Sequence, residues 1–250
     1  MPPCRLTVLR NINQIVVKGK GFRGAAQRGS VLPMIISHGR RYIFVHIPKT
    51  GGTAMALALE SRAKKDDMML GDTPKAVNRR RRLRDVQTRG RLWKHSTLAD
   101  IDGLVTPAQM DGYFCFTLVR NPWDRMVSYY HWLRAQGFDH PAVRLAQELD
   151  FSPFLNHPVT VASLRAAPPP HYMTDAAGQV RCNSYIRLEH FAEDSADLRA
   201  HLGFDVALPR INASNRGRDY RAYYGESDSQ LVAEICGFEV NALGYTFEQG

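Results

Sequence analysis

Two stretches of the chain share one pattern, in which a short continuous run of apolar residues leads through a turn into a segment with helical spacing. The first run covers 42–47 and leads through Gly51 and Gly52 into an Ala- and Leu-rich segment at 53–60. Short β-branched and aromatic runs are typical of buried parallel strands, whereas Ala and Leu are the best helix formers. The sequence therefore predicts a central strand, a glycine turn and a helix in succession.

The second run covers 113–119, and Asn121 and Pro122 follow it. Asn is a favoured helix N-cap, and Pro suits the first helical position because its missing N–H costs nothing there. Apolar residues then recur at helical spacing, at Met126, Val127, Tyr130 and Leu133. The pattern predicts a strand and a helix, with Arg120 at the carboxyl end of the strand, where ligands bind in open α/β sheets.

The rest of the chain has weaker patterns. In chain order they are a charged helical segment at 61–93, a loop at 156–171, a hairpin turn at 175–178, a strand at 185–188, a helix at 195–202 and a closing helix at 227–243. Strands that alternate with helices predict an α/β fold: a three-layer domain with a mainly parallel central sheet and helices on both faces.

The length of 250 residues and the 44% hydrophobic content suit one globular domain. No apolar run approaches the roughly 18 residues of a membrane span, so we expect no stable membrane span. Residues 1–33 contain basic but no acidic side chains. We expect the domain to cover 34–250 and interpret 1–33 as a basic tail, either disordered or an artefact of an upstream start; a transit peptide is the third interpretation.

The net charge of +9 favours anionic ligands or substrates. No nucleic-acid-binding motif is evident, and we expect no nucleic-acid partner. The four cysteines are widely spaced and predict neither a disulfide framework nor a zinc site, so we expect a reducing compartment, the cytoplasm. They are Cys4, Cys115, Cys182 and Cys236.

The turn after the first strand has the features of an anion site. Glycines at 51 and 52 allow close approach to the backbone, the following helix presents unpaired N–H groups, and Lys49, Thr50 and Thr53 add charge and donors. The nucleotide-kinase P-loop places its lysine after the glycines, whereas Lys49 precedes them. The turn therefore predicts a site for phosphate or a group of similar shape, with a purely structural strand-to-helix turn as the alternative.

The segments HIPKTGGT (46–53) and RNPWDRMVSYY (120–130) together resemble the two cofactor motifs of sulfotransferases that use 3′-phosphoadenosine-5′-phosphosulfate (PAPS). The resemblance is closest to the carbohydrate sulfotransferase branch in its soluble bacterial form, and it covers roughly 34–248. It implies a P-loop-like 5′-phosphosulfate loop made of Lys49, Thr50, Gly51, Gly52 and Thr53. It also implies a 3′-phosphate site at Arg120 and Ser128, with Ser214 and Arg216 covering that side.

The reaction that the resemblance implies is transfer of a sulfuryl group from PAPS to a hydroxyl, on a carbohydrate, with PAP as product. A sulfuryl group carries less charge than a phosphoryl group, so fixed donors such as Lys49 can stabilise the leaving phosphate without a metal. A kinase would need a carboxylate near the strand end to hold Mg²⁺, and position 120 is an arginine. A kinase-like phosphotransferase and a non-catalytic module that binds anionic polymers are the alternatives.

The acceptor hydroxyl needs a base, and histidine titrates in the useful range. The resemblance places such a histidine between the two motifs, where His95 stands, and makes Lys49 the second catalytic residue. A lone histidine is most often structural. His46 is the next candidate, although it lies within the first predicted strand, and Glu60 is the third, although it lies at the far end of the loop helix.

Five arginines lie close together at 79–84. Like charges repel, so a solvated helix face or a mobile loop is the simplest interpretation. The functional interpretation is a clamp for an anionic glycan acceptor.

Overall fold

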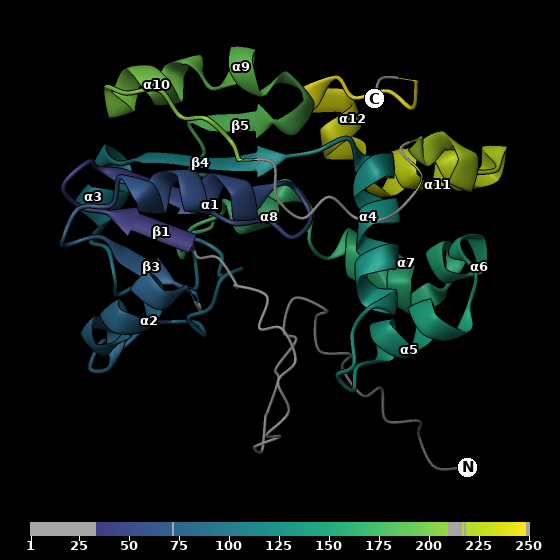
Figure 1. Ribbon diagram of the computed structural model, residues 1–250, viewed down its shortest axis with the longest axis horizontal. Coiled ribbons are helices and arrows are strands. Elements are labelled where there is room, and N and C mark those ends of the chain that lie inside the picture. Colours follow the sequence, from purple (N-terminus) through teal and green to yellow (C-terminus); the bar gives the residue numbers. More distant parts are fainter. Residues whose placement is uncertain (1–33, 72, 210–216, 218, 249–250) are drawn as a thin grey trace.

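The structure is a computed structural model that describes residues 34–71, 73–209, 217 and 219–248. A five-stranded sheet in the order β3-β1-β2-β4-β5 forms its centre (Figure 1). The strands are β1 (Met34–Ser37), β2 (Tyr42–Val45), β3 (Met68–Leu70), β4 (Phe114–Val119) and β5 (Ser184–Arg187). β2, β4 and β5 are parallel, whereas β1 pairs antiparallel with both β2 and β3. The predicted mainly parallel α/β sheet is confirmed, with β1 as the one reversed strand in the part of the chain that is described.

Twelve α-helices surround the sheet within the described residues. They are α1 (Gly52–Ser61), α2 (Pro74–Arg79), α3 (Pro107–Gly112), α4 (Pro122–Arg134), α5 (Pro141–Glu148), α6 (Phe151–Asn156), α7 (Pro158–Arg165), α8 (Pro169–Tyr172), α9 (Phe191–Asp194), α10 (Ala196–Leu202), α11 (Glu226–Ile235) and α12 (Gly237–Leu243). Short 3₁₀ helices are η1 (Arg80–Leu83), η2 (Leu188–His190) and η3 (Tyr220–Tyr223).

Successive side chains of the strands enter two separate cores, as the pleat of a strand requires. Ile35 and Phe44 belong to the core that includes residues of α1, α2 and α10. Ile36 and Ile43 belong to the opposite core, which segment 98–105 and the end of α8 cover. The sheet is thus covered on both faces, but on the second face much of the cover is irregular chain.

The central pair of strands brings the two sequence motifs together. β2 and β4 pair in parallel with Phe44 opposite Phe116 and Val45 opposite Thr117. Their carboxyl ends therefore lie side by side, and the turn after β2 meets the start of the helix after β4. That helix, α4, begins as predicted: the side chain of Asn121 accepts hydrogen bonds from the backbone N–H groups of Trp123 and Asp124, at 3.1 and 3.2 Å.

A third core fixes α4 at one end of the sheet, where α5, α6, α7 and α11 gather around it (Figure 1). The predicted stripe of Met126, Val127, Tyr130 and Leu133 is buried in this core. The hydroxyl of Tyr130 donates to the carbonyl of Leu149 at 2.8 Å, which ties α4 to the end of α5.

The predicted loop at 156–171 is wrong, because it contains α7 and α8. Pro158 and Pro169 each occupy the first helical position, where proline starts a helix rather than interrupting one. The His157 side chain also accepts from the N–H of Val159 at 3.2 Å and so caps α7.

Other boundaries differ from the prediction. The closing helix at 227–243 is two helices, α11 and α12, interrupted at Cys236, where Gly237 weakens helix propensity. The segment 61–93 includes the edge strand β3, and the hairpin around 175–178 is reduced to a single bridge between Thr174 and Val180. The strand at 185–188 and the helix ended by Gly203 are confirmed as β5 and α10.

Residues 1–33, and with them the predicted tail, lie outside the described residues, as do Ser214 and Arg216. Among the helices of the described ranges, none combines the length and the apolar character that crossing a membrane requires.

Candidate active site

The turn between β2 and α1 is tightly wound. Gly51 adopts φ 84° and Lys49 adopts φ 67°, both in the left-handed region. Glycine populates this region freely, but lysine is uncommon there. The Thr50 hydroxyl donates to the carbonyl of Ile47 at 2.9 Å and is buried, so it stabilises the turn itself. The backbone N–H groups that open α1 directly follow this turn, and Lys49 and Thr53 flank it.

Gly52 serves a different purpose from Gly51. It is the first residue of α1, and its backbone is not left-handed. A Cβ atom at this position would lie 2.1 Å from Cδ2 of His46. Glycine is therefore required at 52 by the space that the His46 ring occupies, which the sequence does not reveal.

The second motif meets the turn at Arg120. Its Nη1 lies 3.5 Å from the carbonyl oxygen of Lys49, and its Nε donates to Asp124 Oδ2 at 2.8 Å. Asp124 thus holds the guanidinium at the carboxyl end of β4, beside the turn. Ser128 lies further along α4 and is buried. The structure therefore brings Arg120 to the predicted loop, as the sequence indicates.

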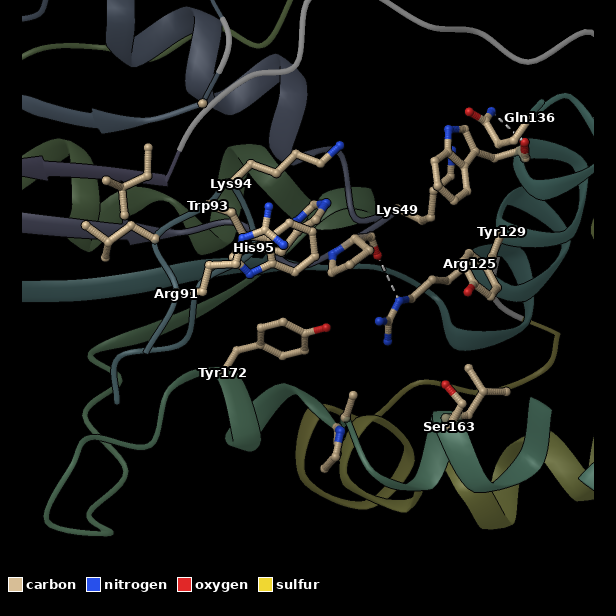
Figure 2. A pocket seen from close by; sticks show the side chains of 18 of the residues that line it. Lys49, Arg91, Trp93, Lys94, His95, Arg125, Tyr129, Gln136, Ser163 and Tyr172 are labelled. Atoms are coloured by element: carbon tan, nitrogen blue, oxygen red, sulfur yellow. Dashed lines mark hydrogen bonds between the residues drawn. The ribbon is translucent and has the colours of Figure 1, made fainter. Parts of the chain in front are cut away.

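A cavity of about 1060 Å³ opens beside the turn, and Figure 2 shows part of its wall. Its basic lining residues are Lys49, Arg80, Arg84, Arg91, Lys94 and Arg125. Its aromatic lining residues are Trp93, Tyr129, Trp132, Phe138 and Tyr172, with His95 beside them. The cavity combines positive charge, which attracts anions, with flat apolar surfaces.

His95 has one fixed tautomer when neutral. Its Nδ1 lies 2.6 Å from the carbonyl oxygen of His46, and a carbonyl can only accept, so Nδ1 carries the proton. Nε2 then holds the lone pair. Burial lowers the pKa of His95 well below its usual value, and the nearby His46 and Lys94 lower it further. The ring is therefore neutral at neutral pH, as a general base must be.

The two other candidate bases do not line the cavity. His46 is 5% exposed, and its ring meets that of His95 edge-on with centroids 4.6 Å apart. Glu60 is also buried, near the end of α1, and its Oε2 has no hydrogen-bond partner among the described residues. Of the three candidates, His95 alone has access to a substrate in this cavity.

The Lys49 ammonium lies 5.7 Å from the centroid of the Trp132 ring, a cation–π arrangement within the cavity wall. Trp132 belongs to α4, so the helix that carries the second motif also contacts the Lys49 side chain of the first motif.

The arginine run has two sides. Arg80 and Arg84 line the cavity. Arg79 and Arg80 donate to the carbonyls of Asp67 and Gly71, each at 3.2 Å, and Arg82 donates to that of Lys65. Neither a free solvated face nor a clamp alone describes the run, because its members also bind the backbone around β3.

Within the described ranges, no three His, Cys, Asp or Glu side chains lie close enough together to hold a metal ion. Cys115, Cys182 and Cys236 are free thiols.

Residues 33–147, a little under half of the chain, match the model of the sulfotransferase family. This part of the chain is similar to the sulfotransferase family. It contains the turn at 48–52, His95, Arg120 and Ser128. A crystal structure of mouse sulfotransferase SULT7A1 complexed with PAP is similar over 84% of this chain and 87% of that one, with 15% sequence identity and a TM-score of 0.42. No curated protein matches the sequence.

Sequence reasoning missed part of the cavity. Arg125, Tyr129 and Trp132 follow i, i+4, i+7 spacing and lie one position before the core stripe of α4. That second stripe was the available signal for Arg125, whose Nε donates to the carbonyl of Pro48 at 3.1 Å (Figure 2). Tyr172 gave no signal, because tertiary packing of α8 brings it to the cavity.

Proposed function

We propose that this protein is a sulfotransferase that transfers the sulfuryl group of PAPS to a hydroxyl of a carbohydrate, with His95 as the base and Lys49 at the leaving phosphate. The observation that carries the proposal is that His95 and Lys49 line one cavity directly beside the turn that precedes α1. The acceptor oxygen attacks sulfur in line, the bond from sulfur to the 5′-phosphate oxygen breaks, and PAP leaves. The hydroxyl proton goes to Nε2 of His95, while the Lys49 ammonium stabilises the charge that develops on the phosphate.

The cofactor takes the 5′-phosphosulfate loop at Lys49, Thr50, Gly51, Gly52 and Thr53. We assign the backbone N–H of Thr50 to the ligand, because its hydroxyl already binds Ile47. Arg120 and Ser128 take the 3′-phosphate, and Asp124 supports the first of them. We propose that Ser214 and Arg216, which lie outside the described residues, cover the 3′-phosphate side. Lys49 supplies charge where a kinase uses Mg²⁺, so we propose that no metal takes part.

The acceptor is an anionic glycan. Arg80, Arg84, Arg91 and Lys94 give the cavity wall positive charge, and the partly exposed Trp93 and Phe138 provide faces on which sugar rings can stack. The free thiols at 115, 182 and 236 support a reducing compartment, and we propose the cytoplasm.

Thermal shift with three ligands tests the donor. PAP should raise the melting temperature without a metal, in proportion to its occupancy. Stabilisation by ATP only when Mg²⁺ is present would favour a phosphotransferase instead. Stabilisation by heparin alone would favour a non-catalytic module that binds anionic polymers. PAPS consumption in the presence of neutral and anionic glycans then identifies the acceptor, and absence of consumption with every acceptor would contradict the carbohydrate assignment.

A further inference from the structure

His46 lies between the cofactor turn and the proposed base. It directly follows β2, and its carbonyl accepts the hydrogen bond of His95 Nδ1. Its ring contacts the His95 ring on one side, with centroids 4.6 Å apart. On the other side the ring occupies the space where a side chain at Gly52 would begin, 2.1 Å from its Cδ2. The His46 ring therefore fills the gap between the first residue of α1 and His95.

Contacts from three directions determine how the His95 ring is held. The Trp93 ring meets it edge-on, with centroids 5.0 Å apart. His46, Lys94 and Arg125 lower the pKa of His95 electrostatically. Lys94 and Arg125 are cationic, and both line the cavity itself. His46 lies behind the base, and its backbone and ring both contact it.

We propose that His46 is a positioning residue for sulfuryl transfer, which holds the His95 imidazole in the orientation and tautomer that a base needs. It does not line the cavity, but its position against Gly52 links the base to the cofactor turn. The inference rests on the proposed function for the identity of the base. The contacts themselves are independent of that function.

Two substitutions at His46 test the orientation. His46→Ala removes the ring and should lower the single-turnover rate by roughly 10- to 100-fold, the usual effect of a small misplacement of a reacting group. PAP affinity should change by less than about twofold, since the cofactor contacts are elsewhere. His46→Phe keeps an aromatic ring against His95 and should restore most of the rate. Equal loss of PAP affinity and rate in both variants would show a merely structural role and overturn the inference.

An NMR readout separates this inference from the proposed function. In protein labelled with ¹⁵N-histidine, a pH titration gives the tautomer and the pKa of His95 without any turnover. His46→Ala keeps the backbone carbonyl that fixes the tautomer but removes the ring, so it should shift the His95 ring signals and raise the pKa of His95, whereas unchanged His95 signals would overturn the inference. Absence of wild-type turnover with every acceptor would instead defeat the proposed function, and the NMR comparison would still decide the role of His46.

The glycine provides a second, independent test. Gly52→Ala should weaken PAP binding and lower the melting temperature, because its Cβ displaces the His46 ring and the turn with it. The double variant Gly52→Ala with His46→Ala should recover both PAP binding and melting temperature but not turnover. A harmless Gly52→Ala, or a double variant that recovers neither property, would show that the ring does not set the requirement for glycine.

Discussion

Lys49 combines an unfavourable backbone with a defined side-chain position. A left-handed φ costs a residue other than glycine on the order of 1 kcal/mol, so the surrounding turn must hold it in place. In this backbone conformation the Lys49 ammonium lies over the Trp132 ring in the cavity wall. The site therefore maintains this lysine at some expense of stability, as functional residues often require.

A pair of substitutions separates these two properties. Lys49→Gly relieves the backbone and should be more stable than Lys49→Ala by roughly 1 kcal/mol, while both lose the ammonium. Both should weaken PAP binding by about ten- to hundredfold, since charge-assisted hydrogen bonds contribute roughly 1.5 to 3 kcal/mol. Arg120→Ala should weaken it similarly. Thermal unfolding and calorimetric titration with PAP measure the two effects, and equal stability of the Gly and Ala variants would contradict the strain argument.

His95→Ala should lower kcat by roughly 10² to 10⁴ and leave PAP affinity nearly intact, because a general base contacts the acceptor rather than the nucleotide. The exposed His190 provides a matched control, and its alanine variant should keep wild-type turnover. Retained turnover in His95→Ala would move the base elsewhere.

The pH profile follows from the lowered pKa of His95. Protonation inactivates the base, so the acid limb of kcat/KM should lie below pH 6.5, with no loss between 6.5 and 8. The unfolded chain binds this proton more readily, so the contribution of His95 to stability should be lost as pH falls from 6.5 through the lowered pKa. Rate and unfolding measurements over this range check both, and an acid limb above 6.5 would contradict the assignment.

At the scale of elements, the two strand-turn-helix units could be predicted, because buried runs, a glycine turn and the Asn121 cap are local signals. The rest depended on contacts between distant segments. β1 and β3 are short strands that pair with each other, and β1 also pairs with β2. The prolines of 156–171 are compatible with a loop and with helix starts. Packing of this segment against α11 and the sheet favours the helices α7 and α8.

The candidate site divides in the same way. The two motifs predict that Lys49 and Arg120 lie close together, and in the structure the Arg120 guanidinium lies beside the carbonyl of Lys49. Lys49 and His95 line the same cavity. The contact between His46 and Gly52 is invisible in sequence, because it depends on where a side chain lies behind the turn.

The arginine run belongs to η1 and its neighbours, and its members can be tested against one another. Arg84→Ala should raise KM for an anionic glycan and leave PAP affinity unchanged, because Arg84 lines the cavity but belongs to neither cofactor motif. Arg81→Ala removes the same charge from an exposed residue outside the cavity and should have little effect. The wild-type KM should rise with salt. Steady-state kinetics measures KM for both variants, and identical KM values would show that Arg84 does not contact the acceptor.

At the scale of the whole molecule, we predict that the domain needs only residues 34–250. Removal of residues 1–33 should preserve the melting temperature and PAP affinity, because the match to the sulfotransferase family begins at residue 33 and β1 begins at Met34. Met34 is fully buried and begins β1, so a chain that starts there places a charged terminal amine beside the core. A chain that starts at Val31 moves this charge away and is the matched control. Loss of folding in both truncations would show that the tail packs against the domain.

The sheet ends at β3, which is three residues long and lies at an edge of the strand order. An open sheet edge can pair with a strand of another molecule, and copies of one protein can aggregate in this way. Here the guanidinium groups of Arg79, Arg80 and Arg82 occupy the carbonyls just before and after the edge strand. Bulky, mutually repelling charges at this border make a second molecule a poor partner for β3. The arginine run thus protects the sheet from self-assembly, whatever its members contribute to the acceptor.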